Sequence, residues 1–218
     1  MLNYFTPFTI FELTCLLAAF VALIRDPRLY WKGMCVYLLA ECIAEFTGIY
    51  LKRHHHSNGW PYDILLIFQI TFISFMFYGL LRTRKDGKWL LTTGTLILAV
   101  LYCIDLFQHG FARFYTLTFN TMSVVFVIYS LFYFFVLIKK DEYIKLQTSA
   151  AFWWVVGVLF FYFGDTAVNV FRGKLAVIKI TENHALPYYI LICLNIILYL
   201  SWSYSFICRK WLTKRSET

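Results

Sequence analysis

Two carboxylates one helical turn apart lie inside a strongly apolar stretch of this chain. Glu41 and Glu45 occur in the segment GMCVYLLAECIAEFTGIYL, and their spacing of four residues places both side chains on one face of a helix. Paired carboxylates can transfer a proton, activate a water molecule or bind a cation. Because like charges one turn apart repel each other in an apolar medium, we expect one of the two to be protonated, or a cation, a His or Arg172 to compensate them.

Two further pairs have the same spacing of four residues. Asp105 and His109 would suit a shared metal ion or an acid–base pair, but equally a solvated pair at a helix end. Asp165 and Asn169 occur in GDTAVN, where Gly164 would allow close helix packing, so their role is either binding or structural. Together with polar residues of the other apolar runs, the candidate ligand-binding set is Glu41, Glu45, Gln69, Asp105, Asn120, Asp165, Asn169, Arg172 and Asn195.

The histidines outside the apolar runs are weaker candidates for metal ligands. The run 54–56 is followed by SNGWP, which predicts an exposed turn, and adjacent histidines of a regular helix cannot all face one ion. His184, in KITENHALP, is expected in a loop from which it could cover a site. The sequence contains no HExxH, GxSxG, Walker A or GxGxxG motif, so it identifies no metal site and no cofactor.

The composition indicates that lipid surrounds most of the chain. Of the 218 residues, 61% are hydrophobic and only 15% are charged, whereas about a quarter are charged in a soluble domain. The formal net charge of +8 does not indicate nucleic-acid binding, because Lys and Arg are confined to short segments between apolar runs. The six cysteines occur singly, without CxxC spacing, and are expected to act as small hydrophobic residues. The first apolar run lacks a preceding basic segment, so we expect it to be retained as a helix.

Seven apolar runs approach the roughly 20 residues that a membrane helix needs. The predicted fold class is all-α: a polytopic membrane protein with a seven-transmembrane-helix bundle that forms a single domain over 1–218. Short linkers make consecutive helices antiparallel neighbours. The predicted spans are 5–24, 33–51, 61–81, 89–108, 115–138, 150–171 and 187–208.

The distribution of basic residues predicts the orientation. Lys and Arg number 14 in the linkers after the first, third and fifth runs and in the C-terminal tail, against 6 in the N-terminal segment and the other linkers. Since cytoplasmic loops are rich in Lys and Arg, the N-terminus is predicted outside and the C-terminus in the cytoplasm. The last run contains no Lys, which excludes a retinal Schiff base in that helix.

With this orientation, every carboxylate inside an apolar run lies at or outside the middle of the bilayer. One carboxylate at mid-bilayer costs about 2.5–3.5 kcal/mol, and such groups usually face a bundle interior or a hydrated cavity. We therefore expect Glu41, Glu45, Asp105 and Asp165 to share one polar cavity open to the outside. The alternative is that protonated carboxyls act only as hydrogen-bonding groups between helices.

Two resemblances extend these expectations. The segment SAAFWWVVGVLFFYFGDTAVNVF is similar to the sixth helix of a family of short, uncharacterised seven-helix bacterial inner-membrane proteins, and AEFTGIYL and PYDILLIFQ extend the resemblance over most of the chain. It implies the seven-helix fold and a bacterial inner membrane, but no activity. Separately, GVLFFYFGD resembles the G-x-L-x-F-x-x-S/G-D element of lysoplasmalogenase-type membrane hydrolases, which carry aspartates within the membrane. The early helix expected to hold a second such element reads LLAECIAEF here.

Three functions are compatible with the sequence. The first is a ligand-binding sensor, receptor or accessory subunit, which would contact membrane lipids and dock a protein partner on its basic cytoplasmic loops. The second is an intramembrane lipid hydrolase, either lysoplasmalogenase-like or metal-dependent, and the third is a proton-coupled transporter. Transport ranks last because the inner half of the bundle lacks a charged relay. For the hydrolase, the candidate catalytic residues are Glu41, Glu45, Asp105, His109 and Asp165.

Overall fold

The computed structural model describes residues 6–54, 59–81, 85–110, 115–139, 145–181 and 184–216, and the side chains within them except those of 85–86 and 212–216. It confirms the all-α prediction, because each predicted apolar run lies largely within a helix. Helices α2, α3, α4, α5, α6 and α8 are long and apolar enough to cross a membrane, whereas α1 is apolar but shorter. The helices are α1 (Pro7–Leu23), α2 (Leu29–Arg53), α3 (Gly59–Leu81), α4 (Lys85–His109), α5 (Thr116–Ile138), α6 (Ala150–Val170), α7 (Arg172–Leu175) and α8 (Leu186–Ser216), with a 3-10 turn at Leu146–Thr148.

Helix starts follow the positions of proline. Pro7, Pro61 and Pro187 lie within the first three residues of α1, α3 and α8, and Pro27 precedes α2. Proline is tolerated there because the first N–H groups of a helix have no partner within it. Elsewhere the apolar runs continue without interruption, so each backbone polar group can be satisfied inside its own helix, as lipid requires.

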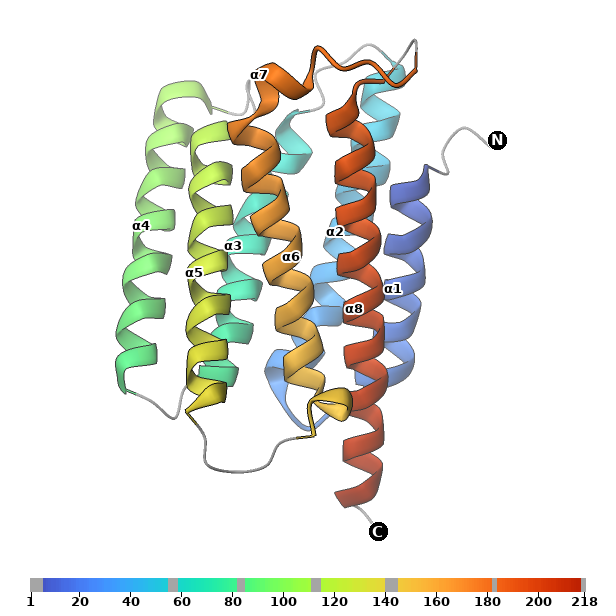
Figure 1. The fold of residues 1–218 in the computed structure, drawn as a ribbon, viewed down its shortest axis with the longest axis vertical. Coiled ribbons are helices and arrows are strands. Elements are labelled where there is room, and N and C mark those ends of the chain that lie inside the picture. Colours follow the sequence, from blue (N-terminus) through green and yellow to red (C-terminus); the bar gives the residue numbers. More distant parts are fainter. Residues whose placement is uncertain are drawn as a thin grey trace.

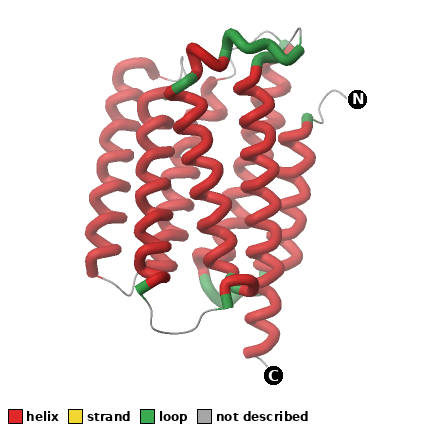
Figure 2. Tube along the Cα trace, in the orientation of Figure 1, coloured by secondary structure: helices red, strands yellow, loops and turns green. Residues whose placement is uncertain are grey.

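The long helices form a closed ring. Helices next to each other in sequence pack side by side, and α8 packs against both α6 and α1 (Figure 1). The N-terminus of α1 and the short helix α7 lie at one end of the bundle, called here the α7 end. The C-terminus lies at the opposite end, and the described loops lie at the two ends (Figure 2).

Aromatic side chains fill the interior in the half nearer the C-terminal end. The Trp154 ring stacks on Trp202 with their centroids 5.9 Å apart, and Phe77 packs edge-on against Trp154 at 5.1 Å. Tyr37 packs against the other side of this group, 6.0 Å from Trp202. All four of these side chains are almost fully buried, so this part of the bundle is a packed core.

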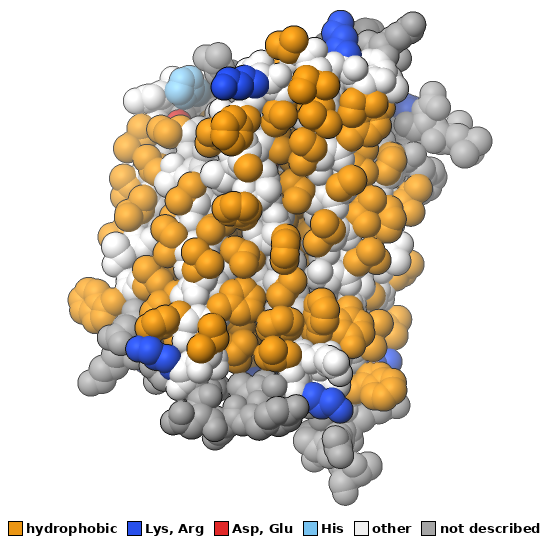
Figure 3. All heavy atoms as spheres, viewed as in Figure 1, with side chains coloured by type: hydrophobic (Ala, Val, Ile, Leu, Met, Phe, Trp, Pro, Cys, Tyr) orange, Lys and Arg blue, Asp and Glu red, His pale blue; other side chains and the backbone are white. Residues whose placement is uncertain are grey.

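The outer surface suits a lipid environment. On the face in Figure 3, hydrophobic side chains cover the bundle along its length, and the Lys and Arg side chains in view lie near its two ends. Among the exposed residues are Leu17 on α1 and Ile43 on α2, at 65% and 58% exposure. The membrane-length helices therefore contact lipid directly, as the sequence predicted.

Candidate functional site

The carboxyl groups of the long helices whose side chains the structure describes lie at mid-helix or toward the α7 end, but they fall into three groups. Glu12, Glu41 and Glu45 form the first, between α1 and α2. Asp63 and Asp105 form the second, at the start of α5. The third is centred on Asp165, between α5 and α6. Each group has its own hydrogen-bond partners, so each is described separately.

The glutamate cluster consists of Glu12 on α1 and of Glu41 and Glu45 on α2. Glu12 lies within electrostatic range of both α2 glutamates, and the thiol of Cys42 lies close enough to hydrogen-bond with it. The predicted common face of Glu41 and Glu45 is therefore turned toward α1. Glu12 is 3% exposed, so the cluster reaches into the packed interior between the helices.

Tyrosine hydroxyls surround this cluster. Tyr37, one turn before Glu41 on α2, donates to Glu41 Oε1 at 3.3 Å, and Tyr62 on α3 donates to Glu45 Oε2 at 3.0 Å. The hydroxyl of Tyr199 on α8 lies close to the Glu41 carboxyl. The predicted residue Gln69 joins the same network, because its side chain is within hydrogen-bonding reach of Tyr37.

Two oxygens of the cluster lack a donor. Glu12 Oε1 and Glu41 Oε2 are buried without a hydrogen-bond partner among the described residues. Among the described residues, the only ion pair joins Asp26 and Arg209 at the opposite end of the bundle. The donors near these glutamates are therefore neutral hydroxyls and a thiol. Buried polar atoms in folded proteins nearly always have partners, so the cluster can accept a donor or a cation.

Asp63 and Asp105 complete the start of α5. The backbone N–H of Tyr115 donates to Asp63 Oδ1 at 3.2 Å, and Thr118 donates to Asp105 Oδ2 through both its N–H and its hydroxyl, at 3.3 and 2.6 Å. The first N–H groups of a helix have no acceptor within the helix. Here aspartates of α3 and α4 accept the hydrogen bonds of two such groups in α5. Asp105 therefore has a structural role, because its hydrogen-bond partner is Thr118 and not the predicted His109.

Asp165 bridges α5 and α6. Its Oδ2 accepts from Ser123 Oγ at 3.0 Å and from Asn169 Nδ2 at 3.1 Å, which realises the predicted pairing with Asn169. The charge of Arg172 acts on Asp165. Tyr162 lies within electrostatic range of both Asp165 and Glu41.

The remaining predicted residues lie apart from these contacts. Asn120 Oδ1 is buried without a hydrogen-bond partner in the described chain, and Asn195 donates to the Leu191 carbonyl of its own helix. The single cavity predicted from the sequence stays a prediction, because Asp105 and Asp165 make separate contacts from those of the glutamates.

The histidines that the structure describes do not assemble a metal site. His109 lies exposed at the end of α4, and His54 packs its ring on Tyr50 while Nδ1 contacts the Tyr50 carbonyl at 2.9 Å. The other two residues of the histidine run, 55 and 56, are outside the described residues. His184 is exposed and stacks on Tyr188, with ring centroids 4.0 Å apart. No group of three His, Cys, Asp or Glu side chains among the described residues could hold a metal ion.

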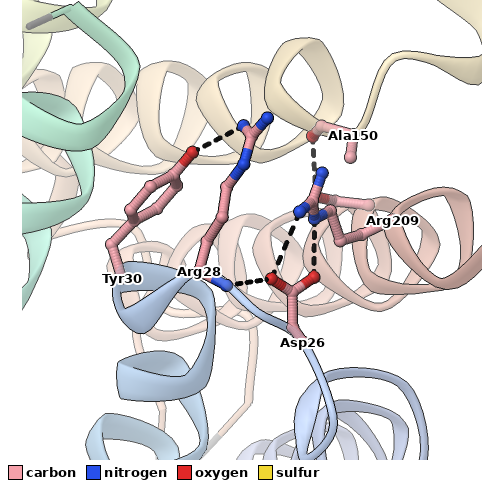
Figure 4. Close-up of polar contacts among 6 residues, drawn as sticks. Asp26, Arg28, Tyr30, Ala150 and Arg209 are labelled. Atoms are coloured by element: carbon pink, nitrogen blue, oxygen red, sulfur yellow. Dashed lines mark hydrogen bonds and ion pairs between the residues drawn. The ribbon is translucent and has the colours of Figure 1, made fainter. Parts of the chain in front are cut away.

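A buried ion pair at the C-terminal end was not predicted. Arg209 of α8 donates from Nε to Asp26 Oδ2 at 2.6 Å and from Nη2 to Oδ1 at 3.2 Å (Figure 4). Asp26, in the α1–α2 loop, also accepts the N–H of Arg28 at 2.8 Å. The two partners are 183 residues apart, so no local pattern indicated the pair.

Two other parts of the site were missed, and both left a signal in the sequence. Glu12 was left out of the candidate set although it is a carboxylate in an apolar run. Tyr37 precedes Glu41 by four residues, the spacing at which helical side chains meet.

Comparisons of this chain with protein-family models, with curated proteins and with solved structures gave no match.

Proposed function

We propose that this chain is a seven-helix integral membrane protein that binds a polar or cationic ligand at the glutamate cluster and acts as a sensor, receptor or accessory subunit. The observation that carries the proposal is the buried, unpartnered carboxylate oxygen of Glu12 beside the α2 glutamates. Ionisable groups inside a membrane are costly, and they usually mark a binding or transfer site. The seventh span would be α1, which packs beside α2 and α8.

A ligand-binding role accounts for the cluster better than a purely structural role. An oxygen without a donor does not by itself distinguish the cluster, because Asp63, which serves the start of α5, also has a buried unpartnered Oδ2. The glutamates instead bring three acidic groups together with neutral donors only, among the residues described. A bound cation would remove their repulsion, because opposite charges a few ångströms apart attract strongly in a medium of low dielectric constant.

The two alternatives gain less support from the same geometry. A hydrolase would need Asp105 and Asp165 to converge on the glutamates, yet each has its own partners. A proton-coupled transporter would need a path through the other half of the bundle, where Trp154 and Trp202 are fully buried. Both alternatives stay predictions.

Signalling from such a site would require a partner chain. The basic loops and the tail at the C-terminal end, which we propose to be cytoplasmic, offer the docking surface. Lys32, Lys88, Lys139 and Lys145 are exposed there. Clustered Lys and Arg also favour contact with anionic lipid headgroups.

Binding of a simple ammonium ion tests the proposal. We expect tetramethylammonium chloride to bind the purified protein in lipid nanodiscs, measured by isothermal titration calorimetry against sodium chloride at equal ionic strength. The double variant Glu41→Gln/Glu45→Gln should bind tetramethylammonium at least about tenfold more weakly than the wild type, because two attracting charges are removed.

The matched control is Asp105→Asn, which neutralises a carboxylate that serves the α5 terminus. Its affinity for tetramethylammonium should equal that of the wild type. Equal affinity in the wild type and the double glutamine variant would reject the glutamate cluster as the site. A folded wild type that binds no ammonium ion at all would reject the cationic ligand.

The proposed orientation has a separate test. Lys179 lies exposed at the α7 end and Lys145 lies exposed at the C-terminal end. A Cys introduced at Lys179 should react with a membrane-impermeant maleimide on intact cells, and one at Lys145 only after the cells are opened. The natural cysteines are first replaced by Ser or Ala, since Cys103 and Cys193 are exposed. The reverse pattern would invert the topology.

A further inference from the structure

A groove on the lipid-facing side of the bundle lies between α2 and α3. It has a volume of about 280 Å³, and its walls are formed by Ala40, Ile43 and Ala44 on α2 and by Pro61, Ile64 and Phe68 on α3. These walls are apolar. Ile43, Ile64 and Phe68 are 58%, 38% and 36% exposed, so the groove opens toward the surrounding lipid.

This groove adjoins the glutamate cluster. Ala44 and Pro61 line it, and the next residue after each, Glu45 and Tyr62, form the hydrogen bond that crosses from α3 to α2. The Tyr62–Glu45 bond therefore lies at the boundary between the apolar groove and the acidic cluster. Gly48 makes this contact feasible, because a Cβ at that position would overlap the Tyr62 hydroxyl.

On the interior side of this boundary, two carboxyl oxygens of the cluster have neither a hydrogen-bond partner nor a counter-charge among the described residues. Glu12 is 97% buried, since its exposure is 3%, and its Oε1 has no hydrogen-bond partner in the described chain. Glu41 Oε2 is in the same state. An anionic ligand would be repelled by three carboxyl groups, whereas an ammonium group would be attracted to them and to the neighbouring tyrosine rings.

The two features together select a ligand that is apolar at one end and cationic at the other. An alkyl chain would fill the groove, where it replaces lipid chains against Ala40, Ile43 and Phe68. Its ammonium group would meet the cluster at Glu45, where it would take the place of the Tyr62 hydroxyl as the partner of that carboxyl. A neutral amphiphile would fit the groove but would leave the carboxyls without a counter-charge.

We propose that the α2–α3 groove and the glutamate cluster together bind a single-chain cationic amphiphile, with its ammonium group at Glu12, Glu41 and Glu45 and its alkyl chain between α2 and α3. The inference rests on the proposed function, because it names the ligand class of the same site. It adds a second binding element, which can be altered independently of the glutamates.

The test compares two probes that share a head group. Decyltrimethylammonium carries the chain and tetramethylammonium does not, and both are titrated into nanodiscs with the protein and into empty nanodiscs. Ala40→Phe fills the groove from α2, and Ala99→Phe is the matched control in the separate groove between α3 and α4, of about 480 Å³. We expect Ala40→Phe to weaken decyltrimethylammonium binding roughly tenfold and to leave tetramethylammonium binding unchanged. The control should change neither affinity.

Each further outcome decides between the two proposals. If tetramethylammonium binding depends on Glu41 and Glu45 but Ala40→Phe leaves decyltrimethylammonium binding intact, the amphiphile inference is wrong and the proposed function stands. If neither probe binds the wild type above empty nanodiscs, both are wrong. Should Ala40→Phe not fold, Ile64→Trp fills the same groove from α3, and the same loss is expected.

Discussion

Replacing Arg209 with Met should destabilise the bundle through the carboxylate that it leaves behind. Asp26 is 2% exposed, and the substitution removes both of its guanidinium contacts. Loss of one partner of a buried ion pair costs about 3–5 kcal/mol. Asp26 keeps the N–H of Arg28 as a donor, so we expect the lower end of this range, about 3 kcal/mol.

The assay is thermal unfolding of the purified protein in one detergent, followed by tryptophan fluorescence. For a chain of this size, 1 kcal/mol corresponds to a Tm change of about 2–4 °C, so Arg209→Met should lower Tm by about 6–12 °C. Asp26→Asn should also lower Tm. The double variant should lose less than the sum of the single losses, because no buried charge then lacks its counter-ion.

Lys210→Met is the matched control, since it removes one positive charge from the adjacent residue of α8 without breaking the ion pair. Its Tm should change by about 2 °C or less, because no buried charge is left without its counter-ion. An Arg209→Met shift no larger than that of Lys210→Met would refute the reasoning. Strict additivity of the two single losses would refute the coupling between Asp26 and Arg209.

Three further substitutions test the packing around the site by the same unfolding assay. Asp105→Ala should cost about 2 kcal/mol by removing the acceptor of the Thr118 N–H and hydroxyl, and Thr118→Val should then add little; full additivity would contradict the shared bond. Gly94→Ala should cost about 1–3 kcal/mol because its methyl group overlaps the Tyr129 hydroxyl, and the cost should fall in a Tyr129→Phe background unless the overlap is elsewhere. Ser205→Ala should cost about 1 kcal/mol, since the Ala150 carbonyl loses the donor that α8 supplies, and an unchanged Tm would show that this bond is dispensable.

The helices could be predicted from the sequence because lipid leaves few alternatives for an apolar run. The largest errors are at helix ends. The run predicted at 33–51 is α2 from Leu29 to Arg53, and the last helix continues past the predicted end at 208 to Ser216. Hydrophobicity marks the part of a helix inside the membrane, whereas the backbone hydrogen bonds continue into the polar interface. The four-residue helix α7 was missed because it contains no apolar run.

The partners of the carboxylates could not be predicted from the sequence to the same extent. Helical spacing predicted one face for Glu41 and Glu45 and grouped Asp165 with Asn169, and the structure joins the second pair by a hydrogen bond. The bonds from Tyr62 to Glu45 and from Ser123 to Asp165 cross between helices, so they depend on helix rotation and depth. Periodicity within one helix carries no information about either quantity.

The position of α8 between α1 and α6 has a consequence for biogenesis. The first six long helices can enter the bilayer and pack in order as they are synthesised, but they leave an open seam along α1 and α6. Along that seam Glu41 would lack the neighbouring Tyr199 hydroxyl of α8, and the tryptophan of α6 that stacks on Trp202 would face lipid. The last long helix must therefore insert before the bundle can enclose its acidic residues, so a ribosome that stalls earlier releases a chain with an unshielded carboxylate in the membrane, which membrane proteases and chaperones can recognise.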